Sequence, residues 1–162
     1  MTNSEKIAEL KEEITRLQGR IEDLEKSEKK SSKWKPKDGE VYWYITEHGH
    51  AVYDIWEDDN IDDERYAIGN CFPTEESAEF EVERLKVIAE MKEFSFEQDW
   101  NNKYQRKYFL YYNCDGADIE IDFYVSTAYD VIYFNSKEQA QACIDSVGQE
   151  RIKKYYFRIK ED

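Results

Sequence analysis

The chain has 162 residues, enough for one globular domain or a small domain with an appendage, but too few for a multidomain enzyme. Hydrophobic residues make up 40% of it, charged residues 37% and aromatic residues 15%, a composition that excludes wholesale disorder. The formal net charge is -14, and the uncharged apolar runs are far shorter than the roughly 18 residues that a membrane span requires. We expect a soluble, cytoplasmic protein with three reduced cysteines and no membrane contact.

Residues 1–30 carry a heptad repeat that is typical of a coiled coil. The apolar residues recur at alternating spacings of three and four, with polar residues at almost every position between them. Isoleucine at the a positions and leucine at the d positions favour a parallel dimer. The predicted dimerisation residues are Ile7, Leu10, Ile14, Leu17, Ile21 and Leu24. The alternatives are a helix that folds back on its own domain and a helix that pairs with a different protein.

Residues 31–40 are predicted to form a basic linker. Lysines crowd this stretch and the residues just before it, together with serines, Pro36 and Gly39. A basic segment that contains Trp34 can touch phosphates and stack on a base, but it stands beside a strongly acidic body. We therefore expect a solvated tether and no direct binding of nucleic acid.

Residues 41–162 are predicted to fold as a globular α+β domain with two halves, 41–98 and 99–162. In the first half, residues 41–46 and 51–56 predict a β-hairpin, and residues 65–69 predict a third short strand. A helix is expected from Thr74, a suitable N-cap that two glutamates follow, to about Glu93. Apolar residues on two sides of this helix predict that it bridges the two halves.

The second half repeats this order. Residues 104–112, 118–124 and 129–134 predict three strands, and the helix that follows is expected to end at Gly148. Residues 151–159 predict a last strand or a tail docked through its aromatic side chains. At an offset of 62 residues, the first half matches the second at Phe72 and Phe134, Thr74 and Ser136, Ala78 and Ala140, and Val82 and Ile144.

The match indicates either a duplicated unit of three strands and a helix, or convergent capping chemistry at two strand-to-helix junctions. The expected fold class is α+β: an N-terminal coiled-coil helix, then one continuous antiparallel sheet or two small ones with helices on one face.

Negative charge is concentrated in the middle of the chain. Residues 47–99 hold seventeen acidic and four basic residues, whereas residues 1–40 and 100–162 are each nearly balanced. Such a field repels nucleic acid and attracts basic protein surfaces, although an acidic surface also serves solubility alone. The predicted partner-binding residues form one run: Glu57, Asp58, Asp59, Asp62, Asp63 and Glu64.

The sequence contains no catalytic signature. A nucleophile elbow and a glycine-rich phosphate loop are missing, and His48 and His50 have no third metal ligand at a diagnostic spacing. The acidic run lacks the mid-loop glycine of an EF-hand calcium site. We therefore expect no enzymatic activity, no cofactor and no bound metal ion.

Four segments resemble small proteins carried by phages and prophages of Gram-positive bacteria. They are WKP at 34–36, YWYI at 42–45, IGNCFPTEE at 68–76 and RIKKYYF at 151–157. The resemblance carries no catalytic residues. It implies a mobile-element protein in the cytoplasm of a bacterial host, a context in which small acidic proteins include anti-CRISPR inhibitors.

Resemblance and charge distribution together suggest a non-enzymatic inhibitor. Its acidic face would occupy a basic, nucleic-acid-binding surface of a host protein, such as the CRISPR effector Cas9, and the coiled coil would link two copies. The alternative is a structural or regulatory adaptor that binds through the coiled coil and whose acidic face is inert.

Overall fold

The computed structural model describes residues 6, 10–20, 34–99, 101–125 and 131–160. The chain divides into two compact units, Met1–Lys35 and Pro36–Asp162. In the first unit, residues 10–20 form a helix, and Leu10, Ile14 and Leu17 are exposed on it. The other predicted dimerisation residues, Ile7, Ile21 and Leu24, lie outside the described residues. The helical state is thus confirmed for the middle of the heptad repeat, while its pairing stays a prediction.

The division between the units falls within the predicted linker. The backbone N–H of Gly39 donates to the carbonyl of Trp56 at 2.9 Å, and the N–H of Trp56 donates to the carbonyl of Glu40 at 2.9 Å. Pro36 is buried. Residues 36–40 therefore belong to the folded second unit, because their backbone groups continue the pairing of the first hairpin.

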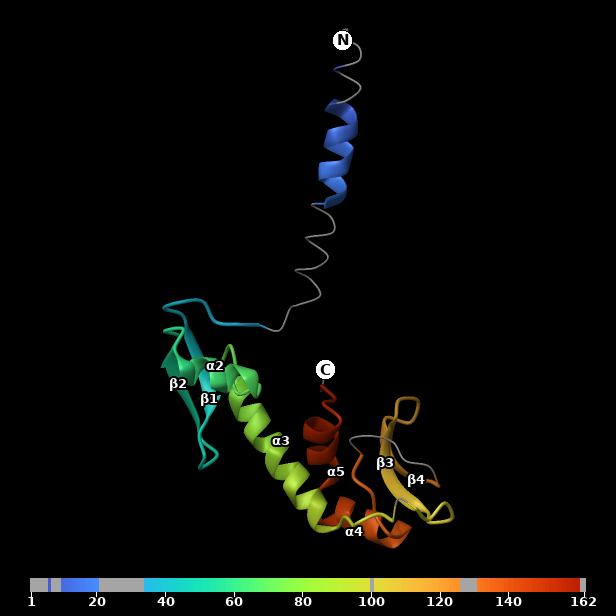
Figure 1. The fold of residues 1–162 in the computed structure, drawn as a ribbon. Helices are drawn as coiled ribbons and strands as arrows, with labels where there is room; N and C mark the ends of the chain where they lie inside the picture. The colour runs from blue at the N-terminus through green and yellow to red at the C-terminus, as the bar shows by residue number, and fades with distance from the viewer. Residues whose placement is uncertain (1–5, 7–9, 21–33, 100, 126–130, 161–162) are drawn as a thin grey trace. The chain divides into compact units, whose positions relative to one another are not determined.

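The second unit has two antiparallel hairpins, each followed by a helix (Figure 1). Strand β1 (Val41–Ile45) pairs with β2 (Ala51–Ile55), and β3 (Lys107–Asn113) pairs with β4 (Asp118–Tyr124). The two hairpins are separate two-stranded sheets. The helices are α2 (Asn60–Ala67), α3 (Glu75–Glu93), α4 (Lys137–Val147), α5 (Gln149–Arg151) and the π-helical turn η1 (Ile152–Tyr156). The α+β class is confirmed.

The strand predicted at 65–69 is wrong, and of the two alternatives for 151–159 the docked tail is formed and the strand is not. Residues 65–69 form the end of α2 and a turn, because Asp59 starts a helix inside the acidic run: its Oδ1 accepts from the N–H groups of Ile61 and Asp62, both at 2.9 Å. Residues 151–156 are helical, and the aromatic side chains around them dock this segment. Of the strand predicted at 129–134, the described part contains only a single bridge, at Phe134.

The two halves share one local arrangement at the junction between hairpin and helix. Phe72 exchanges two backbone hydrogen bonds with Trp43, at 2.8 and 2.9 Å, and Phe134 exchanges two with Tyr108, at 2.8 and 3.1 Å. Two residues after each bridge, a hydroxyl caps the helix: Thr74 caps α3 and Ser136 caps α4. Each half is therefore a hairpin, a bridge and a capped helix, and the predicted unit of three strands and a helix is not what the described residues form.

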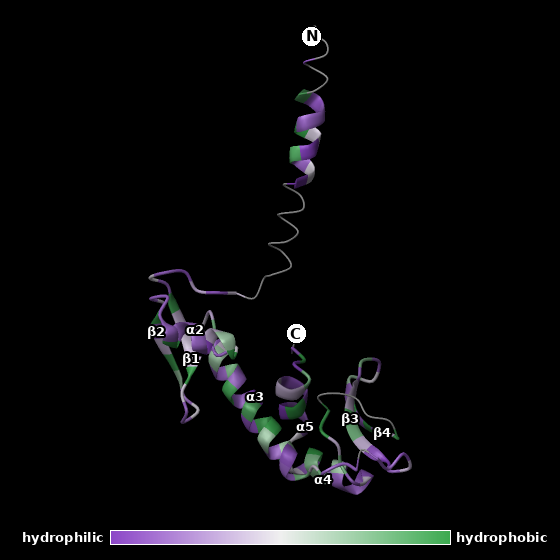
Figure 2. Ribbon diagram, viewed as in Figure 1, coloured by the Kyte–Doolittle hydropathy of each residue, from purple (hydrophilic) through white to green (hydrophobic). Residues whose placement is uncertain are grey.

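Helix α3 links the halves, as its two apolar sides predict. Its residues contact β1 and β2 of the first half and α4 and η1 of the second half. Figure 2 shows apolar residues recurring along α3, while α2 is mostly polar. The largest core joins α3 to the second half through Val87, Met91, Leu110, Phe134, Ala140, Cys143, Ile144, Val147 and Ile152.

An ion pair fixes the end of the chain to α3. Two guanidinium nitrogens of Arg151 donate to the two carboxylate oxygens of Glu90, at 2.6 and 2.8 Å. Such a bidentate pair sets an orientation as well as a distance. The C-terminal segment is thereby held along α3.

We predict that Ser136→Ala lowers the free energy of unfolding by about 1 kcal/mol, because it removes the hydroxyl that accepts from the N–H of Gln139 at the start of α4. Ser146→Ala is the matched control: Ser146 is exposed inside the same helix, where alanine is at least as favourable as serine. Urea unfolding followed by tryptophan fluorescence measures both. Equal effects of the two substitutions would contradict the capping role.

Candidate protein-binding surface

The acidic run lies on two consecutive parts of the first half, the loop 56–59 that follows β2 and helix α2. Trp56 is buried and its indole Nε1 donates to Oδ1 of Asp58 at 3.2 Å. Asp58 has a φ of 57°, a left-handed conformation that aspartate tolerates better than most residues. Asp59 then caps α2. Two carboxylates of the run therefore shape the loop that carries the others.

Asp62 is the centre of a buried polar network. It is only 3% exposed, and both of its oxygens are used. Oδ1 accepts from the hydroxyl of Tyr42 at 2.7 Å, and Oδ2 accepts from the backbone N–H of Glu57 at 2.7 Å. Because Tyr42 is on β1 and Asp62 is on α2, this network joins the helix to the hairpin.

Arg65 extends the network to the second strand. Its Nη1 donates to the hydroxyl of Tyr42 at 2.5 Å and to Oδ2 of Asp54 at 2.8 Å. The guanidinium also lies over the ring of Tyr44, at 3.6 Å from the ring centroid. One arginine of α2 thus contacts three side chains of the hairpin.

These contacts fix the protonation states of the network. Burial by itself would raise the pKa of Asp62, but hydrogen bonds from Tyr42 and from backbone N–H groups hold that pKa below its usual value. Burial and the hydrogen bond to Asp62 raise the pKa of Tyr42. At neutral pH the network therefore consists of an ionised carboxylate and a protonated phenol.

The structure removes Asp62 from the predicted partner-binding surface. The other predicted residues, Glu57, Asp58, Asp59, Asp63 and Glu64, are exposed. A run of charges in the sequence does not show which residue a helix turns inward. The first turn of α2 directs Asp62 toward Tyr42. Its carboxylate is therefore buried and hydrogen-bonded within the protein and is not available to a partner.

Exposed apolar residues lie among these carboxylates, and charge counting does not find them. Ile61 on α2 is 57% exposed, and Ile68, the C-cap residue of α2, is 80% exposed; with Glu64 they are spaced by three and four residues and so share one face. On the hairpin, Tyr53 and Ile55 are exposed as well, but they lie on the face opposite Asp54, the β2 residue that Arg65 of α2 contacts, since successive residues of a strand alternate between faces. In the sequence, the seven-residue spacing of Ile61 and Ile68 was the pattern that could have indicated this apolar face.

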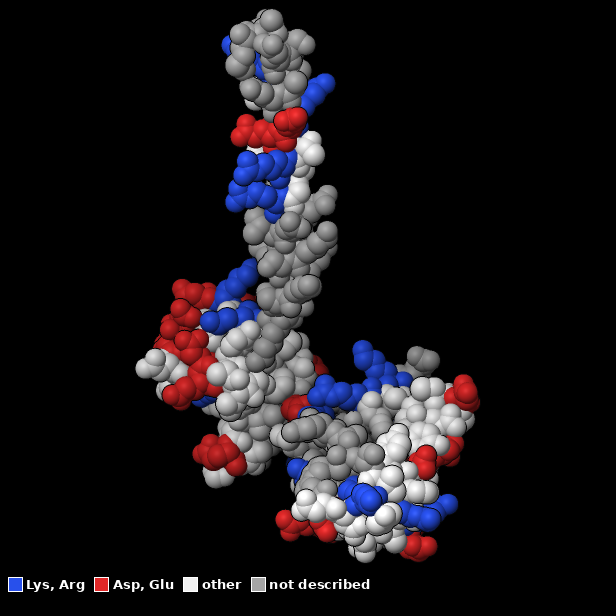
Figure 3. Space-filling model, turned by 45° about the vertical axis from the view of Figure 1, so that its right-hand side comes forward, with Lys and Arg blue, Asp and Glu red and all other residues white. Residues whose placement is uncertain are grey.

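We call this set the acid–isoleucine surface. It consists of the exposed residues Glu57, Asp59, Ile61, Asp63, Glu64 and Ile68. Figure 3 shows acidic side chains gathered over the part of the second unit that holds β1, β2 and α2.

Elsewhere in residues 47–99, several carboxylates are already paired within the protein. Glu81 is 3.0 Å from Arg84 and 3.2 Å from Arg158, and Glu83 is 2.6 Å from Lys86. In contrast, Glu57 and Glu64 form no ion pair with any residue that the structure describes. Glu57 and Glu64 therefore keep their charge uncompensated by described residues, as do Glu75, Glu76, Glu79 and Glu93 of α3.

The described part of the chain shows no arrangement suited to metal binding or thiol chemistry. No three His, Cys, Asp or Glu side chains within the described ranges are grouped so that they could hold a metal ion. All three cysteines are free thiols, and burial raises the pKa of Cys143 to about 11. Among the described helices, none combines the length and the apolar character needed to cross a bilayer.

Comparisons of the chain with protein-family models, with curated proteins and with solved structures find no match. The acid–isoleucine surface is therefore interpreted from its own geometry. Exposed carboxylates around apolar side chains on a braced scaffold are features of a surface that binds another protein.

We predict that Asp62→Asn destabilises the protein by about 1–3 kcal/mol at neutral pH, because the amide cannot accept both hydrogen bonds that Asp62 accepts. The folded-state pKa of Asp62 is lowered, so its contribution is fully present above the ordinary aspartate pKa and is lost as the pH falls through the lowered value. The stability difference between wild type and variant should therefore shrink in acid.

Urea unfolding at a series of pH values measures this difference. Asp115→Asn is the control, since Asp115 is exposed in the turn between β3 and β4. A difference between wild type and Asp62→Asn that stays constant across the acid range would contradict the assigned role of the carboxylate.

Proposed function

We propose that the protein acts without catalysis, by binding a basic, nucleic-acid-binding surface of another protein through the acid–isoleucine surface. The observation that carries the proposal is the coincidence of Glu57 and Glu64, which form no ion pair with a described residue, with the exposed side chains of Ile61 on α2 and Ile68 just after it. Carboxylates at the positions of phosphates compete with nucleic acid for lysines and arginines. The isoleucines add buried apolar area, which a charged surface alone does not supply.

The rigidity of the surface supports this function. Helix α2 has eight residues, too few for a stable isolated helix, and it is held by the cap at Asp59 and by the network of Asp62 and Arg65. A charged surface that is already ordered loses less conformational entropy on binding. Some carboxylates of the acidic run therefore stabilise the surface, and others are available to bind a partner.

The resemblance to phage and prophage proteins supports a host-inhibition context for this binding. We propose a bacterial host protein as the target, and a CRISPR effector such as Cas9 as the first one to test. A bound inhibitor of this kind would exclude guide RNA or target DNA from the groove that it occupies.

The test compares a double variant with a matched control. Glu57→Gln with Glu64→Gln removes two charges from the acid–isoleucine surface, and Asp115→Asn with Asp145→Asn removes two exposed charges from the second half. We expect the first pair to weaken binding to purified, RNA-free Cas9 about tenfold at low salt, and the second pair to have little effect. Interferometry at several salt concentrations and a DNA-cleavage assay measure the result.

Should Cas9 not bind, the same variants are applied to proteins retained from a host lysate. The proposal requires a retained protein that heparin displaces and that the Glu57 and Glu64 double variant retains poorly. Binding that is indifferent to salt and to both variants would rule out the electrostatic mechanism.

A second candidate function is an adaptor that works through the N-terminal helix. The observation in its favour is the exposure of Leu10, Ile14 and Leu17, which share one seam of the described helix. A stripe this narrow is buried by pairing with another helix. Dimerisation by this seam is also compatible with the first function, since two linked copies bind with avidity.

We predict that the wild-type chain sediments as a dimer and that Leu17→Lys converts it to a monomer, because a charge at a d position is buried on pairing. Gln18→Lys, which adds the same charge beside the seam, should leave the dimer intact. Analytical ultracentrifugation over a concentration series measures both. A wild-type monomer at every concentration would contradict the pairing.

Removal of residues 1–30 separates the two functions. An inhibitor that acts through the acid–isoleucine surface keeps weak binding, because the surface belongs entirely to the second unit. An adaptor that acts through the helix loses its binding.

A further inference from the structure

A pocket of about 660 Å³ lies between the first turns of α3 and the C-terminal segment of the chain. A volume of this size is typical of small-molecule sites. Phe72 and Phe80 supply aromatic rings to the lining, and the C-terminal segment supplies three basic residues and Ile159. The lining residues are Phe72, Ser77, Phe80, Glu81, Lys154, Arg158, Ile159 and Lys160.

The pocket is positively charged in a protein that is strongly negative. Lys154, Arg158 and Lys160 face a single acidic lining residue, Glu81. Neither Lys154 nor Lys160 forms an ion pair with a described residue, whereas the nearby Lys153 pairs with Asp118 and Glu150. The lining therefore has an excess of positive charge that the fold leaves uncompensated.

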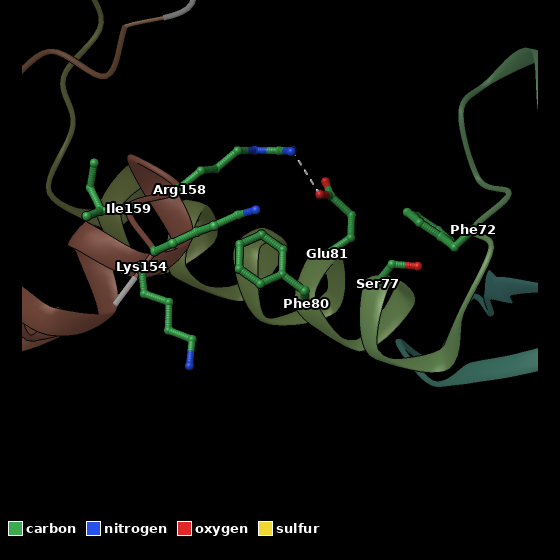
Figure 4. A pocket seen from close by; sticks show the side chains of 8 residues that line it. Phe72, Ser77, Phe80, Glu81, Lys154, Arg158 and Ile159 are labelled. Carbon is green, nitrogen blue, oxygen red and sulfur yellow. Dashed lines mark hydrogen bonds and ion pairs between the residues drawn. The ribbon is translucent and has the colours of Figure 1, made fainter. Parts of the chain in front are cut away.

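Glu81 is already bound by another arginine. Both of its oxygens accept from Nε of Arg84 at 3.0 Å, and Arg158 adds one contact through Nη2 at 3.2 Å. Figure 4 shows Arg158 reaching toward Glu81 beside the ring of Phe80. A guanidinium has five N–H donors, so Arg158 keeps most of its hydrogen-bonding capacity for a ligand.

The backbone around Arg158 is unusual. Its φ is 56°, a left-handed conformation, and it directly follows Phe157, the C-cap residue of η1, at a position where glycine is the common residue. The π-helical turn before it is a rare element that recurs at functional sites. An arginine here is less favourable for folding than glycine, which points to a role for its side chain in binding.

We propose that this pocket binds a small organic anion that carries a hydrophobic ring. Its phosphate or carboxylate group contacts Arg158, Lys154 and Lys160, and its ring lies against Phe80, Phe72 and Ile159. The excess positive charge selects the anion, and the apolar wall selects the ring. The acid–isoleucine surface is negatively charged and repels such an anion. The two sites therefore bind different ligands, and the pocket is independent of the protein-binding function.

The test uses a series of ligands that share one ring. The full-length protein is titrated by calorimetry with 1-naphthyl phosphate, 1-naphthoate, the neutral 1-naphthylmethanol and inorganic phosphate. We expect one or both naphthyl anions to bind at least about tenfold more tightly than the alcohol and than phosphate alone, since both parts of the pocket are needed. The stronger naphthyl anion shows whether phosphate or carboxylate is preferred.

Three variants locate the site. Lys160→Gln and Arg158→Gly should each weaken binding of the preferred anion roughly two- to fivefold, as expected for exposed charge contacts. Lys137→Gln, which removes an exposed charge on α4 outside the pocket, should leave binding unchanged. Arg158→Gly should also raise the unfolding temperature, because glycine adopts this φ without strain, and a loss of binding then cannot be ascribed to unfolding.

Binding of the neutral alcohol as tightly as the anions would overturn the proposal. So would equal weakening by Lys137→Gln and Lys160→Gln, or the absence of binding by either naphthyl anion.

Discussion

The architecture of the first half depends on one buried carboxylate. Asp62 accepts a hydrogen bond from Tyr42 on the hairpin and another from the backbone of Glu57 in the loop. A buried charge is tolerated only when its hydrogen bonds are satisfied, so the helix, the loop and the strand must take up their positions together. Arg65 reinforces the same joint from one turn further along α2, through Tyr42 and Asp54. In this half of the protein, the polar network holds the helix, the loop and the hairpin together in place of a large apolar core.

This constraint explains why the acidic run is more than a charged surface. Asp58 and Asp59 shape the loop and begin the helix, and Asp62 fastens it. Ile61, Asp63 and Glu64, which lie next to Asp62 on the helix, are exposed. A partner protein therefore contacts charged and apolar side chains that are already ordered. The carboxylates that set their geometry are ones that the partner does not touch.

Much of the fold was predictable from local chemistry. Thr74 and Gly148 mark the start of α3 and the end of α4 because capping is a local interaction. The hairpins follow from alternating β-rich runs around short turns. The helix at Asn60–Ala67 escaped prediction, because β-rich residues at 65–69 outweighed a cap formed by one aspartate in a crowded acidic run. Exposure of Ile68 and burial of Asp62 depend on tertiary contacts, so hydrophobicity and charge in the sequence indicated the opposite. The basic pocket joins residues about 80 positions apart, which no local pattern connects.

The uneven placement of charge in the second unit has a physical consequence for how the molecule approaches other bodies. Carboxylates gather over the first hairpin and α2, while Lys154, Arg158 and Lys160 lie together at the far end of the sequence. Separated charges of opposite sign give the unit a permanent electric dipole. In the field of a polycation such a body experiences a torque before it makes contact, so it arrives with its negative pole foremost.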